Sequence, residues 1–184
     1  MKLSMGTMKL AYGLGVLLVA TMGAQAAMAD TTYTNTGKDF TSAGSPFSTS
    51  DFVSGSFTIS APLADDLSLD DIAGDLVSYS FSDGVDTLTQ TNSSTAVFDV
   101  STDTNGLITQ WHITLLNAPL DTKEIYTISI PTFTKDDGSA IGIGQGSNTN
   151  DPGSWATTPE PCSLGLFGTG ALWIVGLIRR KIAG

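Results

Sequence analysis

The feature that most constrains the fold is a repeated alternation of apolar and polar residues, interrupted by turn residues. It is clearest around Asn105-Gly106, where an alternating run stands on each side of the pair. A period of two places apolar side chains on one face of a β-strand, and Asn-Gly between two such runs is a strong hairpin signal. An amphipathic helix would instead show apolar residues every three or four positions. The pattern therefore predicts antiparallel strands.

Five runs along the middle of the chain share this period. Asp83-Gly84 is expected to make a tight turn after the second run, and Pro131 to end the last one, because proline cannot donate to a β-ladder. We expect an all-β fold of about seven short strands, an antiparallel β-sandwich or jelly-roll-like domain over residues 30–141. The residues expected to share a face within each run are Val53, Phe57 and Ile59; Val77, Tyr79 and Phe81; Ala96, Phe98 and Val100; Leu107, Trp111, Ile113 and Leu115; and Tyr126, Ile128 and Ile130.

Residues 142–158 have a different composition. They are rich in Gly, Ser and Asn, which is typical of loops and flexible linkers. We expect a flexible stalk there, with Trp155 available to fold back onto the domain. No cysteine lies between residues 30 and 158, so no disulfide is expected to support the domain.

Both ends of the chain are apolar. Residues 1–29 combine two lysines, an apolar core and small residues at Ala27 and Ala29, which predicts a signal peptide cleaved before Asp30. Residues 162–178 are uncharged and long enough for about 25 Å of helix. Such a segment predicts one transmembrane helix. The alternatives are an uncleaved N-terminal membrane helix and a C-terminal helix buried in the domain.

A basic cluster ends the apolar segment: Arg179, Arg180 and Lys181. By the positive-inside rule it is expected to act as a membrane stop on the cytoplasmic side, leaving residues 30–158 outside. Just before the segment stands Pro159-Glu160-Pro161, and its two prolines disfavour helix and keep the backbone extended.

The ordered set of tripeptide, glycine-containing apolar helix and basic end over residues 159–184 resembles a PEP-CTERM sorting signal. The resemblance implies recognition and processing at the membrane by an exosortase-type enzyme, in bacteria that often make extracellular polysaccharide. Residues 44–63, 78–89 and 98–115 are similar to a small β-rich ectodomain that recurs among PEP-CTERM proteins, which implies a destination and no activity.

The segment between the apolar ends is strongly acidic. From Asp30 to Thr158 it carries seventeen Asp or Glu and three Lys, which argues against nucleic acid as a partner. The charge serves either solubility or binding of divalent cations. Closely spaced loop carboxylates can supply the oxygens that Ca²⁺ needs, although no EF-hand loop is present. The candidate calcium ligands are Asp65, Asp66, Asp70, Asp71 and Asp75; no other cofactor is expected.

Catalytic motifs are weak. His112 is the only histidine, and no nucleophile elbow accompanies it. The glycines at 142, 144 and 146 lack the strand and helix that a dinucleotide site requires. Four aromatic residues could stack on sugar rings, although Trp111 lies on an apolar strand face and is expected in the core. These four are Tyr33, Trp111, Tyr126 and Trp155.

The sequence therefore favours an exported, membrane-tethered protein of the cell surface or extracellular matrix, without enzymatic activity. Its expected role is structural or adhesive, in association with extracellular polysaccharide. The first alternative is a carbohydrate- or Ca²⁺-binding module. The second is a glycan-active enzyme, since paired carboxylates can hydrolyse glycosidic bonds.

Overall fold

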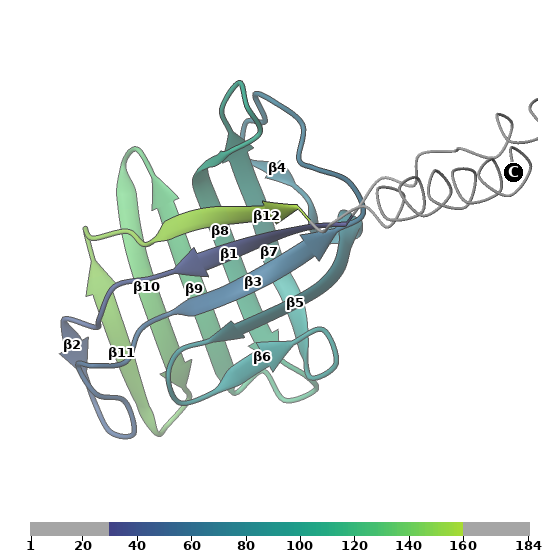
Figure 1. Cartoon of the computed structure of the whole chain (residues 1–184). Coiled ribbons are helices and arrows are strands. Elements are labelled where there is room, and N and C mark those ends of the chain that lie inside the picture. The colour runs from purple at the N-terminus through teal and green to yellow at the C-terminus, as the bar shows by residue number, and fades with distance from the viewer. Residues whose placement is uncertain (1–29, 160–184) are drawn as a thin grey trace, which may run out of the picture. The chain divides into compact units, whose positions relative to one another are not determined.

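The computed structural model describes residues 30–159, and these residues form two antiparallel sheets (Figure 1). Every neighbouring pair of strands is antiparallel, which confirms the all-β, antiparallel prediction. The predicted signal peptide with Ala27 and Ala29, residues Glu160 and Pro161, the apolar segment 162–178 and the basic cluster lie outside the described residues. Within residues 30–159, no helix is long and apolar enough to cross a membrane.

The first sheet has five strands in the order β12-β1-β3-β5-β6. The second has seven, in the order β2-β11-β10-β9-β8-β7-β4, and a short 3-10 turn, η1 (Ala73–Asp75), follows β4. The strands of the five-stranded sheet are β1 (Thr31–Thr36), β3 (Ser54–Ile59), β5 (Leu76–Ser82), β6 (Thr87–Thr89) and β12 (Ser154–Pro159). Those of the seven-stranded sheet are β2 (Ser42–Ala43), β4 (Asp70–Asp71), β7 (Ser93–Thr102), β8 (Ile108–Asn117), β9 (Lys123–Ile130), β10 (Phe133–Ala140) and β11 (Gly144–Thr149).

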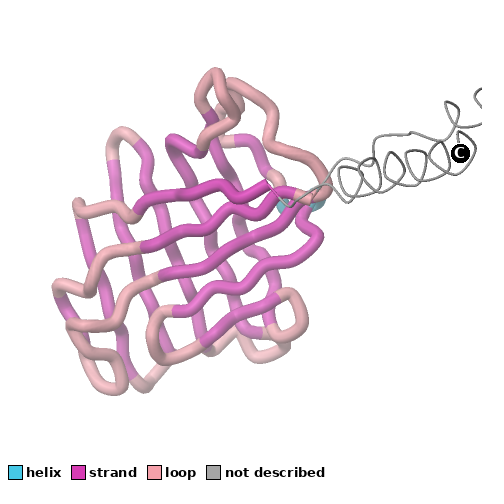
Figure 2. The backbone as a smooth tube through the Cα atoms, in the orientation of Figure 1, coloured by secondary structure: helices cyan, strands magenta, loops and turns pink. Residues whose placement is uncertain are grey.

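The two sheets face each other, and their strands cross at a steep angle (Figure 1). Strands and their connecting loops make up almost all of the described residues (Figure 2). The core between the sheets is aromatic: the ring of Phe98 on β7 lies 5.2 Å from that of Phe57 on β3 and 6.2 Å from that of Phe81 on β5. All three side chains are fully buried, so they join the sheets by packing apolar surface that water cannot reach.

Most of the predicted inward residues are in this core, and two of the exceptions are at β-bulges. A β-bulge places one extra residue in a strand and turns its side chain to the other face. Pairing of β3 with β5 skips Val77, which is 47 % exposed, and pairing of β7 with β8 skips Ala96, which is also exposed. Leu107 precedes β8 in the hairpin turn and is exposed as well. The alternation of apolar and polar residues in the sequence continues through these positions, but the regular alternation of side chains between the two faces of the sheet is interrupted there.

The stalk predicted at residues 142–158 is wrong. Residues 144–149 form β11, and residues 154–159 form β12, the edge strand beside β1. Gly146 is needed in β11 because its Cα faces the ring of Phe40, where a Cβ would stand 2.3 Å away. Trp155 packs against Phe57 and Trp111, so it does fold back onto the domain, as the sequence analysis expected. The domain therefore extends to Pro159, where the predicted sorting motif begins.

Candidate functional site

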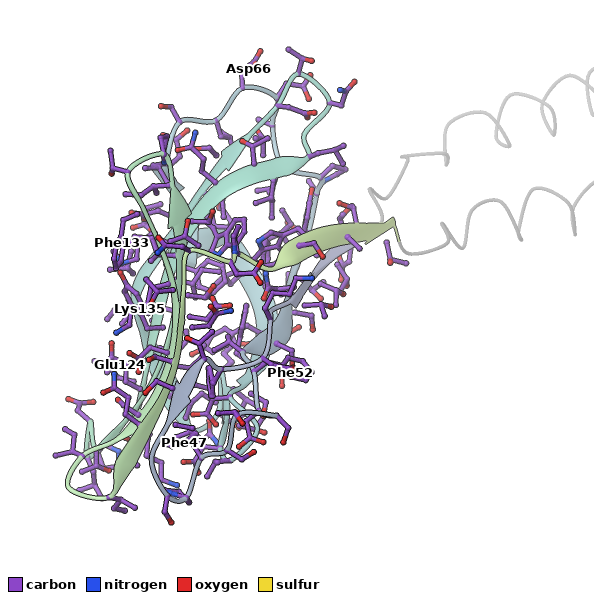
Figure 3. All side chains as sticks on the ribbon, turned by 90° about the vertical axis from the view of Figure 1, so that its left-hand side faces the viewer. Phe47, Phe52, Asp66, Glu124, Phe133 and Lys135 are labelled. Carbon is purple, nitrogen blue, oxygen red and sulfur yellow. The ribbon has the colours of Figure 1, made fainter. Side chains whose placement is uncertain are left out.

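The strongest candidate site is a groove on the outer face of the seven-stranded sheet, the face turned away from the five-stranded sheet. It has a volume of about 310 Å³ and lies over β9, β10 and β11. Figure 3 shows three of its residues, Glu124, Lys135 and Phe133, along the same side of the sheet. The lining residues are Glu124, Tyr126, Phe133, Lys135, Asp137, Ser139 and Gln145.

The strand register brings these side chains together. Tyr126 on β9 is opposite Asp137 on β10, and Glu124 is opposite Ser139. Because side chains in a strand alternate between faces, these residues share the outer face, while Ile125 and Asp136 point into the core. Tyr126, Ile128 and Ile130 were predicted to share a face. They do, but this face is the outer one, and the core position on β9 belongs to Ile125.

Two aromatic side chains give the groove apolar surface. Phe133 is 44 % exposed at the start of β10, and Tyr126 is partly buried with its ring 5.6 Å from that of His112. Asp137, the neighbour of Tyr126, is four positions after Phe133 along β10, which corresponds to about 13 Å of strand. The groove is therefore elongated along β10, with the Phe133 ring at one end, the Tyr126 ring near the middle, and Glu124 and Ser139 at the other end.

The polar groups of the groove are held in place. Lys135 forms an ion pair with Asp137, and Gln145 Nε2 donates a hydrogen bond to the same carboxylate. Burial raises the pKa of the Tyr126 hydroxyl, the charge of Lys135 opposes this rise, and Glu124 and Asp137 add to it. The hydroxyl thus stays protonated at neutral pH and can donate a hydrogen bond. Glu124 belongs to neither of the two ion pairs found in residues 30–159.

The structure does not gather the five aspartates of the predicted calcium site at one point. All five aspartates are exposed, and Asp66 stands at the far end of the sheet from the groove residue Glu124 (Figure 3). Asp70, Asp71 and Asp75 line a separate hollow of about 360 Å³, without Asp65 and Asp66. In the described part of the chain, no three Asp, Glu, His or Cys side chains are arranged to hold a metal ion. Local hydrogen bonds hold the loop instead, such as the one that the Ala73 amide donates to Asp71 Oδ1.

One carboxylate near this loop is perturbed. Burial raises the pKa of Asp99 on β7, the charges of Asp71 and Asp70 raise it further, and His112 opposes them. Asp71, Asp99 and His112 stand side by side on β4, β7 and β8. His112 therefore lies on the outer face, opposite to Trp111, as the alternation of β8 predicts, and its neighbours are a carboxylate and an aromatic ring.

The other predicted aromatic candidates are in the core. Trp111 is 4 % exposed, and its Nε1 donates a hydrogen bond of 2.8 Å to Thr127 Oγ1. Tyr33 is buried, and its hydroxyl accepts a hydrogen bond from the Leu63 amide. Among the four, only Tyr126 lines the groove. Phe133 was not predicted, although an aromatic residue shortly after a strand-ending proline is a signal that could have identified it.

The groove thus combines two aromatic rings with a hydroxyl, an amide and charged groups on a rigid sheet. Ligand sites in proteins commonly have this composition, in which apolar surface supplies affinity and a few polar groups fix orientation. Comparison of the chain with protein-family models, with curated proteins and with solved structures gives no match. What the groove can bind follows from its lining alone.

Proposed function

We propose that this chain is an exported, membrane-tethered surface or matrix protein that adheres to extracellular polysaccharide through the groove over β9, β10 and β11. The observation that carries the proposal is the placement of Tyr126 and Phe133 beside fixed polar groups on an open sheet face. The two-layer arrangement supports a β-sandwich of the jelly-roll type, an architecture that lectins also use.

Sugar rings suit this lining for a physical reason. A pyranose has apolar C–H faces and hydroxyl groups around its edge. Aromatic side chains offer flat apolar surface, and the Tyr126 hydroxyl, Ser139 and Gln145 offer hydrogen-bond donors and acceptors beside it. The distance between Phe133 and Tyr126 along the strand leaves room for more than one ring, which favours a polymer over a free monosaccharide.

Charge narrows the class of polysaccharide. Seventeen acidic residues and three lysines over residues 30–158 give the domain a negative electrostatic potential. Of these residues, Glu124, Asp137 and Lys135 line the groove, so its own net charge is also negative. Polymers rich in uronate or sulfate would be repelled at low ionic strength. Neutral or amine-bearing polysaccharides are the better ligands.

The role is adhesive and not catalytic. Retaining glycoside hydrolysis requires two carboxylates about 5–5.5 Å apart, one of them free to donate a proton and the other free to attack. In the groove, the Asp137 carboxylate is already bound by Lys135 and Gln145. A carboxylate held by these two contacts supports the function of a binding surface, where fixed polar groups orient a ligand without reacting with it.

Export and sorting are the second half of the proposal. The signal peptide delivers the domain across the membrane, the apolar segment 162–178 tethers it, and an exosortase-type enzyme processes the tail at Pro159-Glu160-Pro161. Support comes from the sequence pattern and from the end of β12 at Pro159, which is also the first residue of the proposed motif. Cell fractionation with mass spectrometry of both chain ends, with and without exosortase, tests it. A full-length tail in both strains would contradict sorting.

Binding is tested by gel affinity electrophoresis of the full chain in detergent, with neutral, amine-bearing and acidic polysaccharides in the gel. We expect retardation by at least one neutral or amine-bearing polymer. Phe133→Ala and Tyr126→Ala should each weaken it by about tenfold, since one aromatic contact is worth about 1 kcal/mol or more. Leu120→Ala is the matched control, because Leu120 is 71 % exposed in the β8–β9 turn outside the groove. Equal loss in all three variants, or retardation by acidic polymers alone, would contradict the proposal.

A further inference from the structure

A cluster of buried polar side-chain atoms lies between the two sheets, beside the end of β1 and the middle of β10. Six of these atoms have no hydrogen-bond partner among the described residues. A buried polar atom left without a partner costs about 1–3 kcal/mol, so six together require an explanation. The atoms are Asn35 Oδ1 and Nδ2, Asp136 Oδ1 and Oδ2, Asn148 Oδ1 and Trp155 Nε1.

The strand register brings their side chains together. Asp136 on β10 is opposite Asn148 on β11, and both are at most 2 % exposed. Gly37, the residue after the end of β1, lies next to Asp136: a Cβ built on Gly37 would be 2.9 Å from Asp136 Oδ2. Asn35 is two residues earlier on the same face of β1, and it is opposite Trp155 on β12. The end of β1 and the middle of β10 therefore bring these side chains into the same region between the sheets.

The cluster has more acceptors than donors. Four of its unpartnered atoms are oxygens, against one amide and one indole nitrogen. The Thr127 hydroxyl accepts a hydrogen bond from Trp111 Nε1, which leaves its own hydrogen for the neighbouring Asp136 carboxylate. Hydrogens on the Asn35 amide, the Trp155 indole and the Thr127 hydroxyl can turn toward these oxygens. All three groups are neutral, however, so none of them supplies the positive charge that an ionised Asp136 carboxylate requires.

Charge points in the same direction. The Asp136 carboxylate is buried between the sheets, with 2 % of the residue exposed. The two ion pairs in residues 30–159 join Lys123 to Asp86 and Lys135 to Asp137, so neither neutralises Asp136. A buried carboxylate at neutral pH requires a compensating positive charge or a proton.

We propose that Asp136, Asn148 and Asn35 bind one Ca²⁺ ion between the two sheets. Ca²⁺ takes six to eight oxygens in flexible geometry, including carboxylate and amide oxygens, and backbone carbonyls or water can complete the set. Mg²⁺ fits less well, because it demands octahedral geometry and gives up its water reluctantly. The ion would tie β1 to β10 and β11. Asp137, the next residue, points into the groove on the other face, so the ion would also stabilise the strand that carries the groove.

The first test is thermal unfolding of the full chain in detergent, in Ca²⁺ and in EDTA. We expect Ca²⁺ to raise Tm by roughly 5 °C, with a rise that grows with the logarithm of free Ca²⁺. Asp136→Asn should abolish this shift. The double variant Asp65→Asn/Asp66→Asn should keep it, because those carboxylates are exposed and far from the cluster. Equal Tm of the wild type in Ca²⁺ and in EDTA overturns the proposal, whatever the variants do.

The second test locates the ion and does not depend on stability. Tb³⁺, which replaces Ca²⁺, emits when a nearby tryptophan is excited, and Trp155 belongs to the cluster. We expect Trp-sensitised Tb³⁺ emission that saturates at one ion per chain and is displaced by Ca²⁺. Emission that is absent in the wild type, or that survives unchanged in Asp136→Asn, overturns the proposed site. Binding to the polysaccharide has no part in either test, so this proposal and the proposed function fail separately.

Discussion

Replacing Phe98 tests how the two sheets are held together. Phe98 on β7 is fully buried, and its ring contacts Phe57, Tyr79 and Phe81 of the opposite sheet at centroid distances of 5.2, 6.3 and 6.2 Å. Truncation of a buried Phe to Ala costs about 3–5 kcal/mol, because apolar burial is lost and a cavity remains. Contact with three rings places Phe98→Ala near the upper end, at about 4–5 kcal/mol.

The assay is equilibrium unfolding in urea, with the free energy extrapolated to water. A loss of this size is a large part of the 5–15 kcal/mol by which domains are typically stable. Val97→Ala is the matched control, since Val97 is the neighbouring residue on the outer face of the same strand, and it should cost about 0.5–1 kcal/mol. Equal costs for the two variants would refute the assigned register of β7 and the two-sheet packing that depends on it.

Two further predictions concern the core and pH. Gly55→Ala should destabilise the chain by about 2–3 kcal/mol in urea unfolding, because a Cβ there would stand 2.3 Å from the Phe81 ring, whereas Gly74→Ala, with nothing within 4 Å, should be almost neutral. Burial raises the pKa of Asp83 above the usual value for an aspartate, so its charged form is disfavoured in the fold. Its contribution to stability therefore improves as pH falls through that raised pKa. Asp83→Asn should therefore gain most over the wild type at neutral pH and lose this advantage toward pH 4, measured by urea unfolding across the range; a gap independent of pH would contradict the assignment.

Much of the fold could be predicted from the sequence, because alternation is a local property of strands. The burial of Phe57, Phe98 and Trp111 follows from it directly. The bulges at Val77 and Ala96 could not be predicted, since they depend on which residues of the partner strand pair, and pairing is not local. Strands β11 and β12 were missed for a related reason. Their Gly, Ser and Asn content is typical of a linker, and they are strands only because β1 and β10 provide partners.

The candidate groove was only partly accessible to sequence analysis. Tyr126 was identified as an exposed aromatic candidate, but β9 is apolar on both faces, so the sequence alone does not say which face is outside. Phe133 and Gln145 join the groove through the pairing of β9, β10 and β11. The cluster around Asp136 depends on contact between the sheets. The adjacent Asp136 and Asp137 are alike in the sequence, and only the structure shows that Asp136 faces the other sheet while Asp137 faces the groove.

The most direct test of the account is hydrogen–deuterium exchange of the full chain with and without the polysaccharide that retards it. If the groove binds the polymer, peptides covering residues 123–140 should exchange more slowly in its presence, and Phe133→Ala should remove this protection. Peptides from β5 on the opposite sheet should be unchanged. Protection confined to β5 or to the loop at residues 60–75, with none over β9 and β10, would contradict the account.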